Sequence, residues 1–188
     1  MTFEKDIESS LNVLRAGGII LYPTDTLWGI GCDATDAKAV ERIFELKNRP
    51  PGKSMIVLVA EERDILQYVA GPDPAVFIYL EQIARPTTVI YDHAIGLAEN
   101  LLAEDGSIGI RICREEFCRH LIKRFRKPIV STSANLSGSP APSSFAGISP
   151  VIIEGVDYVV NFRREEPGNN QASSVIRWTN GKIDILRS

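Results

Sequence analysis

Cysteine and histidine are scarce in this sequence, and their positions exclude some common kinds of site. The 188 residues contain three cysteines and two histidines, which are Cys32, Cys113, Cys118, His93 and His120. No Cys-x-x-Cys pair occurs, so the spacing argues against a zinc site or a disulfide framework. The net charge of −3 argues against a chain built throughout to bind polyanions, and any nucleic-acid surface has to be a local patch.

Long apolar runs are also missing. No stretch approaches the roughly 18 apolar residues of a membrane-spanning helix, and the first residues show no basic segment followed by an apolar core. We therefore expect a reduced, cytoplasmic protein with no membrane partner. The composition, with 44% hydrophobic and 24% charged residues, is typical of a globular protein. We expect residues 1–188 to form one domain with a sizeable core.

Apolar periodicity and turn residues predict an α/β fold. Helices are expected over residues 4–16, from Asp36 to before Pro50, twice between 61 and 84, and over 94–102 and 115–126. Strands are expected over 19–22, 55–59, 87–91, 107–112 and 128–130. A C-terminal hairpin is expected to pair 173–178 with 182–187 around Thr179-Asn180-Gly181.

Two of the predicted strands end in polar segments rich in hydroxyls and glycine. Residues 131–138 read Ser-Thr-Ser-Ala-Asn-Leu-Ser-Gly, and residues 22–33 contain Pro-Thr-Asp-Thr-Leu-Trp-Gly-Ile-Gly. If the chain stays extended, Ser131, Ser133 and Asn135 point to one side and can hold phosphate or carboxylate oxygens. Each segment alone is also consistent with an ordinary turn. Ligands of open α/β sheets bind at strand exits, so two such segments favour one shared site.

Three cations lie close together after the helix that begins at Asp36. Lys47, Arg49 and Lys53 surround Pro50-Pro51-Gly52. Lys47 and Arg49 are consistent with simple partners for the carbonyls at the helix end. Lys53 fits this less well, because it follows two prolines and a glycine. A shaped loop with two or three cations suits a triphosphate, since Arg binds phosphate bidentately and Lys acts as a compact charge.

Two further basic features have a structural and a functional interpretation. Arg111 lies among apolar residues of a predicted strand, where an ion pair on the sheet face is the more common role than catalysis. The 115–126 helix should turn Phe117, Leu121, Ile122 and Phe125 inward and Arg119, Lys123, Arg124 and Arg126 outward. Most such basic faces are only solvated. This one is the best local candidate for contact with an RNA backbone.

Taken together, the sequence resembles the YrdC family, whose members include threonylcarbamoyl-AMP synthases. The Pro-Thr-[Asp/Glu]-Thr-x-[Tyr/Trp]-Gly-x-Gly segment of that family matches Pro23 to Gly31. Its Lys-x-Arg matches Lys47 to Arg49, and its Ser-x-Asn followed by Leu-Ser-Gly matches Ser133 to Gly138. Three motifs in the same order over nearly the whole chain form a specific signal. The resemblance implies a twisted mixed sheet with flanking helices and a concave, positively charged cleft.

The resemblance also implies an activity, which is synthesis of threonylcarbamoyl-AMP and pyrophosphate from L-threonine, bicarbonate and ATP. Its product serves partner proteins that transfer the threonylcarbamoyl group to adenosine in ANN-decoding tRNA. Mg²⁺ is expected on the ATP phosphates, and no metal held by the protein alone. The implied site residues are Lys47 and Arg49 for catalysis; Lys47, Arg49, Lys53, Thr88, Ser131, Ser133 and Asn135 for ATP; and Thr26, Ser133 and Arg187 for threonine.

Two departures from the family pattern keep other interpretations open. Ile83-Ala84-Arg85-Pro86-Thr87-Thr88 stands where the family usually has Trp-Pro-Gly-Pro-Leu-Thr, and Leu58 stands where some synthases carry a polar residue near threonine. Arg85 could add a cation to the cleft. A YciO-type paralogue with another product, or with none, is therefore one alternative. A non-catalytic protein of the same fold that binds double-stranded RNA or tRNA is the other.

Overall fold

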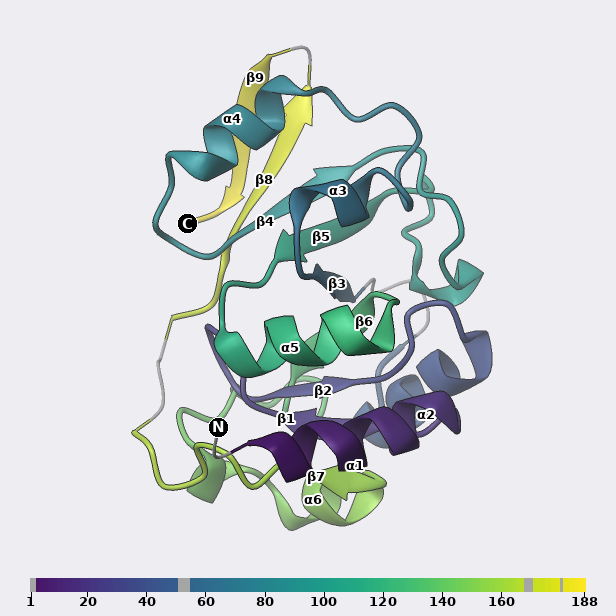
Figure 1. Ribbon diagram of the computed structural model, residues 1–188, viewed down its shortest axis with the longest axis vertical. Coiled ribbons are helices and arrows are strands. Elements are labelled where there is room, and N and C mark those ends of the chain that lie inside the picture. Colours follow the sequence, from purple (N-terminus) through teal and green to yellow (C-terminus); the bar gives the residue numbers. More distant parts are fainter. Residues whose placement is uncertain (1–2, 51–54, 168–170, 180) are drawn as a thin grey trace.

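The computed structural model describes residues 3–50, 55–167, 171–179 and 181–188. Nine of its segments form one mixed sheet, in the order β7-β1-β2-β6-β3-β5-β4-β8-β9. In Figure 1 the C-terminal hairpin and α4 lie at one end of the molecule, and β1, β7 and α6 lie at the other. The strands are β1 Ile20–Tyr22, β2 Gly29–Gly31, β3 Ile56–Val59, β4 Thr87–Tyr91, β5 Ile108–Ile112, β6 Ile129–Ser133, β7 Tyr158–Val159, β8 Ser174–Thr179 and β9 Lys182–Arg187.

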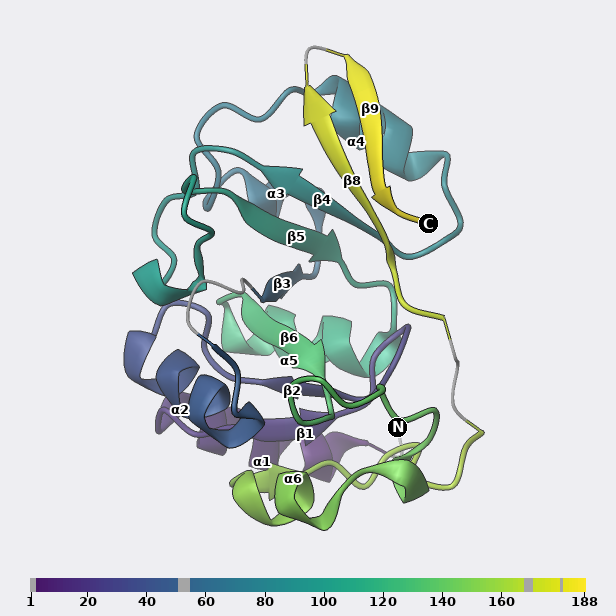
Figure 2. The ribbon, with the colours of Figure 1, turned by 180° about the vertical axis from the view of Figure 1, so that it is seen from behind.

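Six α-helices and two short 3-10 turns accompany these strands among the described residues. They are α1 Glu4–Arg15, α2 Ala37–Lys47, α3 Glu62–Ile65, α4 Ala75–Glu81, α5 Glu116–Phe125, α6 Pro150–Gly155, η1 Glu99–Leu101 and η2 Phe145–Gly147. None of the helices in these ranges is both long and apolar enough to cross a membrane. Figures 1 and 2, which view the molecule from opposite sides, show α1 and α5 on one side of the sheet and α2 on the other.

The two longer N-terminal helices form where local chemistry predicts them. Ile7, Leu11 and Leu14 bury one stripe of α1. The side chain of Asp36 caps α2 by accepting hydrogen bonds from the backbone N–H groups of Lys38 and Ala39. This cap satisfies donors that would otherwise lack partners in the first helical turn. Both helices are confirmed to within one or two residues.

Apolar side chains fill both sides of the sheet. One cluster joins α1 and α5 to β1, β3 and β6 through residues that include Leu11, Phe117, Leu58 and Ile129. The other joins α2, α4 and α6 to the opposite faces of the strands. As predicted, Phe117, Leu121, Ile122 and Phe125 point inward from α5. Because both faces of the central strands are covered, a ligand can reach these strands at their polar ends.

The helix expected over residues 94–102 does not form. Ala94 pairs with Val69 in an isolated β-bridge, and Gly96 has a φ of +67°. Ala98 is extended, so only the single turn η1 remains. The other predicted elements are present, including the two helices on either side of Gly71–Pro74 and the β8–β9 hairpin. Asn180 in the predicted hairpin turn lies outside the described residues.

Gly31 is required at the end of β2, where its backbone packs closely against Tyr22 and Val130. A Cβ atom at this position would lie 2.7 Å from Cε1 of Tyr22 and closer still to the carbonyl oxygen of Val130. We expect Gly31→Ala to lower the free energy of unfolding by about 3 kcal/mol, because backbone and a buried ring would have to move. Urea denaturation measures this loss.

Gly147→Ala is the matched control for this prediction. Its added methyl group would meet Cβ of Pro142 at 3.5 Å, an ordinary van der Waals distance. The free energy of unfolding should change by less than about 1 kcal/mol. Equal losses from the two variants would contradict the packing argument.

Candidate functional site

A cleft of about 330 Å³ lies where the two hydroxyl-rich strand exits meet. The exits are brought together because β6 pairs antiparallel with β2, with Ser133 opposite Gly29 and Thr132 opposite Ile30. The cleft lining includes Thr26, Trp28, Gly29, Arg49, Ile56, Arg111, Ser131, Thr132, Ser133, Ser173 and Arg187. Five of the residues predicted from the sequence therefore share one cavity: Thr26, Arg49, Ser131, Ser133 and Arg187.

The β1–β2 loop holds Thr26 at this cleft through a hydroxyl network. Thr24 Oγ1 donates to the carbonyl of Leu27 at 2.7 Å and accepts the backbone N–H of Thr26 at 3.1 Å. The hydroxyls of Thr24 and Thr26 are 3.1 Å apart. Cys118 Sγ donates to the carbonyl of Pro23 at the start of the loop. Thr24 thus fixes the turn, and Thr26 lines the cleft.

The polar segment after β6 stops being extended before it reaches Asn135. Ser131 and Ser133 line the cleft from β6. The backbone N–H of Asn135 turns back to the carbonyl of Ser133 at 2.9 Å. The amide nitrogen of Asn135 donates to the carbonyls of Leu136 and Ser139, while its Oδ1 is buried without a partner among the described residues. A continuous ladder of Ser131, Ser133 and Asn135 is therefore wrong, because a tight turn intervenes.

Lys47 is buried beneath this turn. Its side chain is in the last turn of α2 and is 1% exposed. Nζ donates to the carbonyl of Ser133 and, at 2.6 Å, to that of Asn135. Burial lowers the pKa of Lys47 to about 8, with a smaller contribution from the charge of Arg49. In this structure the ammonium holds the exit of β6 rather than lining the cleft.

The other two cations of the predicted phosphate loop have different outcomes. Asn48 adopts a left-handed conformation with φ of 48° and ends α2. The chain then turns so that Arg49 lines the cleft, where burial lowers its pKa. Lys53 lies outside the described residues, so its role stays a prediction.

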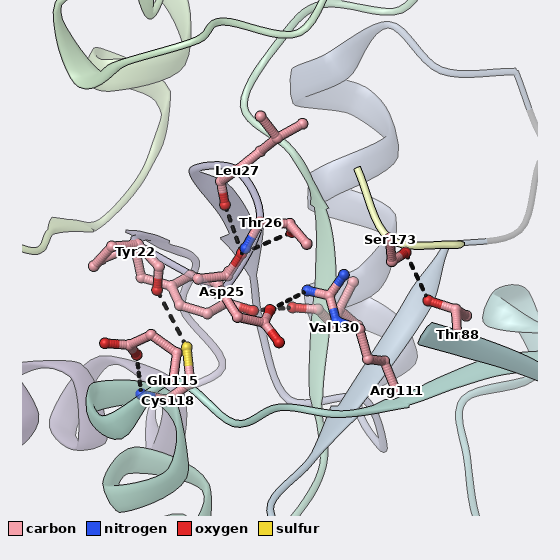
Figure 3. A network of polar contacts seen from close by, with 12 residues as sticks. Tyr22, Asp25, Thr26, Leu27, Thr88, Arg111, Glu115, Cys118, Val130 and Ser173 are labelled. Carbon is pink, nitrogen blue, oxygen red and sulfur yellow. Dashed lines mark hydrogen bonds and ion pairs between the residues drawn. The ribbon is translucent and has the colours of Figure 1, made fainter. Parts of the chain in front are cut away.

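Arg111 joins the cleft through a buried ion pair. Its NH2 atom lies 3.0 Å from Oδ1 of Asp25, and the two side chains are 3% and 12% exposed. Figure 3 shows the pair spanning from β5 to the β1–β2 loop. Nε of Arg111 is buried and has no hydrogen-bond partner among the described residues. The expected ion pair is present, and Arg111 also contributes a guanidinium to the cleft, which the sequence alone did not assign.

Thr88 and Ser173 connect Arg187 to the sheet. The hydroxyl groups of Thr88 and Ser173 are 2.9 Å apart and buried (Figure 3). Arg187 donates from Nε and NH2 to the carbonyl of Ser173, at 3.1 and 2.9 Å. Thr88, which was expected to contact the nucleotide, is fully buried. It acts on the cleft through Ser173.

A register shift in the last hairpin sets the direction of Arg187. Ile176 pairs with Ile185, but Val175 pairs with Arg187, so Leu186 is an extra residue in β9. Such a bulge reverses the face of every residue beyond it. Val175 also pairs with Thr88, and Thr88 with Arg111. The bulge therefore places Arg187 on the same face of the sheet as Arg111.

The two departures from the family pattern differ in burial: Leu58 is buried, whereas residues 83–86 are exposed or half-buried. Leu58 is fully buried in the cluster beneath α1 and α5 and pairs with Arg111 on the next strand. Arg114 supports the segment before β4 by donating to the carbonyls of Leu80 and Ile83, at 2.8 and 2.7 Å. Arg85 is exposed and lies beside a separate small cavity. Its charge contributes to lowering the pKa of Arg187, after burial and Arg111.

Comparison with known proteins places the chain in a family. The Sua5/YciO/YrdC family profile, described as "Telomere recombination", matches residues 12–188. The chain belongs to this family. It is 31% identical over 189 residues to the threonylcarbamoyl-AMP synthase of Pseudoalteromonas translucida, covering 97% of this chain and 98% of that one. Its identity to the threonylcarbamoyl-AMP synthase of Xanthomonas campestris pv. campestris (strain B100) is 33% over 165 residues, covering 86% and 88%.

Solved structures confirm the family fold. P. abyssi Sua5 complexed with L-threonine superposes with a TM-score of 0.87 at 24% identity, covering 98% of this chain and 54% of that one. E. coli YciO superposes with a TM-score of 0.80 at 23% identity, covering 97% and 88%. The chain spans about half the length of the Sua5 protein it matches. The expected mixed α/β sheet with flanking helices is thereby confirmed.

The lowered pKa of Lys47 predicts a pH dependence of stability. Between pH 8 and the ordinary lysine value of 10.5, the unfolded chain keeps a proton that the folded chain has lost. The free energy of unfolding contributed by Lys47 should therefore rise with pH across this window, by about 2–3 kcal/mol. The free energy of unfolding of wild type and of Lys47→Met is measured by urea denaturation at pH 7.5 and pH 10.5. The wild-type value minus the Lys47→Met value should be larger at pH 10.5. A difference that stays flat or falls with pH would contradict it.

The bulge predicts that ligand binding depends on the order of Leu186 and Arg187 in β9, and not only on the presence of an arginine. Exchanging them (Leu186→Arg with Arg187→Leu) moves the guanidinium to the extra position without changing composition. We expect about tenfold weaker binding of L-threonine, the ligand expected at Arg187, by calorimetry, which is the value of one charge-assisted hydrogen bond. Deleting Leu186 should preserve binding, since the arginine then follows Ile185 directly and still pairs with Val175. Wild-type affinity in the exchanged variant would rule out this role of the bulge.

Proposed function

We propose that this protein is an L-threonylcarbamoyladenylate synthase, a nucleotidyltransferase that uses L-threonine, bicarbonate and ATP. One observation carries the proposal: hydroxyls from both strand exits and three arginines from separate segments share one cleft. Catalysis that joins three substrates carrying phosphate or carboxylate-type groups needs positioning and charge stabilisation more than a strong nucleophile. The names of the relatives above support the same reaction.

The ATP side of the cleft is assigned to Arg49, Ser131 and Ser133, which come from the α2 exit and β6. Arg49 binds the phosphates bidentately, and the serine hydroxyls donate to phosphate oxygens. Lys47 supports them by fixing the carbonyls of Ser133 and Asn135. An incoming phosphate favours the ammonium form of Lys47. Lys53 is assigned to the same phosphates, and the buried Oδ1 of Asn135 is assigned to a donor group of the nucleotide.

The threonine side is assigned to Thr26, Arg111 and Arg187, together with Ser133. A guanidinium is well suited to a carboxylate because its N–H groups match the two oxygens. Arg187 is held by Ser173, and Arg111 by Asp25. Thr88 contributes by positioning Ser173 rather than by touching substrate. These fixed cations orient the amino acid so that its amine faces bicarbonate.

The reaction then proceeds by two bond-forming steps. The threonine amine attacks bicarbonate, and loss of water leaves a carbamate. A carbamate oxygen attacks the α-phosphorus of ATP while the bond to the β-phosphate oxygen breaks, which releases pyrophosphate. Negative charge accumulates on the leaving pyrophosphate. Arg49 is placed to stabilise this charge, and Lys47 acts through the backbone it holds.

Magnesium is proposed to enter with ATP rather than to occupy a protein site. The described part of the chain holds no group of three or more His, Cys, Asp or Glu side chains that could bind a metal. Asp25, which lies beside the cleft, is paired with Arg111. Mg²⁺ commonly keeps most of its water and binds phosphate oxygens. Its contribution would be to neutralise phosphate charge, and none of the roles above depends on it.

The product is proposed to pass, in the cytoplasm, to proteins that modify tRNA. A YciO-type paralogue with another product is the nearest alternative, because the Ile83–Thr88 segment departs from the family pattern. Leu58, the other departure, is buried in the apolar cluster instead of lining the cleft. An RNA-binding protein without catalysis is the more distant alternative.

The test measures pyrophosphate release by the purified protein, with the nucleotide product identified by mass spectrometry. Release should require ATP, L-threonine and bicarbonate together, and the product should be threonylcarbamoyl-AMP. Arg49→Ala should reduce kcat/KM by at least about a hundredfold, the loss of a charge-assisted contact to a developing charge. ATP binding without threonine-dependent turnover would support the paralogue and refute the synthase.

Arg177→Ala is the matched control for the arginine variant. Arg177 is an arginine of β8 that forms two ion pairs, with Asp92 and Asp105, and it does not line the cleft. Its activity should match that of wild type. Equal losses in the two variants would show that the effect of Arg49→Ala is not specific to the cleft.

A further inference from the structure

We propose that this protein has a second binding site, for a phosphate group, at the opposite end of β3 from the cleft. Ile56 at the start of β3 lines the cleft, and Val59 at its end lines a separate cavity of about 530 Å³. Its walls also include α3 and the end of α5. The volume is in the range of ordinary small-molecule sites. Nothing in the proposed synthase reaction uses this cavity.

Cations outnumber carboxylates in the lining of this second cavity. Arg63, Lys123, Arg126 and Lys127 contribute positive charge, and Glu61 and Asp64 contribute negative charge. Both carboxylates are already engaged. Asp64 accepts the backbone N–H groups of Ala60 and Glu61 at the start of α3, at 3.1 and 2.9 Å.

Glu61 is shared between two cations. It pairs with Arg63 at 2.8 Å and with Lys123 from α5. Among these three side chains the cations outnumber the carboxylate by one, and over the whole lining four cations face two carboxylates. Lys127, in contrast, is paired with Asp33 at 2.5 Å. A phosphate would meet donors from two separate segments, α3 and α5.

Arg126 is the residue that points most directly to a ligand. It ends α5 in the left-handed conformation, with a φ of 62°. Glycine adopts this conformation at helix ends without strain, whereas the arginine here adopts it against its backbone preference. Its guanidinium makes no ion pair or hydrogen bond within the described parts of the chain and lines the cavity. An exposed guanidinium on a strained backbone, beside a cavity with spare positive charge, is suited to binding phosphate.

The helix dipole alone does not account for this arrangement. Basic residues in the last turn of a helix stabilise its free carbonyls, and Lys123 and Arg124 already fill this role in α5. Glycine at position 126 would satisfy the backbone equally well. The side chain of Arg126 is therefore free to serve a ligand.

The experiment is a titration of inorganic phosphate into ¹⁵N-labelled protein with assigned amide resonances, at constant ionic strength. Amides of residues 61–68 and 122–127 should shift along a saturable curve of their own, separate from that of cleft residues 26–31 and 131–133. Chloride at the same ionic strength should not produce these saturable shifts. Shifts confined to the cleft residues, or an identical response to chloride, would overturn the proposal.

Arg126→Gly tests the site without endangering the fold, since glycine relieves the left-handed strain. The apparent Kd at residues 61–68 and 122–127 should rise by at least about tenfold, while the cleft shifts and the unfolding midpoint are maintained or improved. Arg124→Ala is the control, because Arg124 pairs with Glu4 outside the cavity. Wild-type binding by Arg126→Gly would overturn the proposal.

A second arm identifies the source of the phosphate. A short RNA duplex is titrated at matched phosphate concentration. Tighter, salt-sensitive shifts of the same amides would support the site and assign it to a nucleic-acid backbone. Shifts with phosphate but not with duplex would support the site and assign it to a free phosphate compound. Pyrophosphate release from the cleft is assayed in parallel, so loss of the synthase activity and loss of this site are distinguishable.

Discussion

The buried guanidinium of Arg111 constrains the rest of the site. A charge 3% exposed within a sheet needs a partner, because desolvation of an unpaired ion costs several kcal/mol. Asp25 supplies that partner at 3.0 Å, and the β1–β2 loop must cross the exit of β6 to bring it there. Thr26, the next residue, is thereby placed at the cleft. Buried ion pairs add little net stability, so the main consequence of this one is geometric.

Arg187 follows from the same sheet geometry, whereas Arg49 comes from the end of α2. Arg111, Thr88, Val175 and Arg187 form one row across β5, β4, β8 and β9. The pKa of Arg187 is lowered by burial and then by Arg111 and Arg85, and that of Arg49 by burial. The fold therefore buries positive charge at the cleft, and this burial costs free energy in the ligand-free protein. An anion in the cleft would relieve that cost, which is a form of electrostatic preorganisation.

Local chemistry in the sequence was sufficient for most of the fold. The Asp36 cap, the α5 apolar stripe and the hairpin depend on neighbours within a few residues, and all are present. The family resemblance likewise identified five residues of the cleft, three of them within its motifs. What could not be predicted depends on distant partners: Asp25 is 86 residues from Arg111, and the failed 94–102 helix gives way to a bridge with Val69. The bulge at Leu186 has no signal in residue type at all.

Lys47 shows why a motif can identify a residue without giving its geometry. The Lys-x-Arg pattern is equally consistent with a phosphate ligand and with a dipole partner at the end of α2. The i, i+4, i+7 spacing of Val40, Phe44 and Lys47 places Lys47 on the buried stripe of α2. Its ammonium therefore needs hydrogen-bond acceptors inside the protein. The carbonyls of Ser133 and Asn135 provide them because β6 ends in a turn. Arg49, two residues later, is beyond the helix and free of that stripe, which is why one cation of the motif lines the cleft while the other supports its wall.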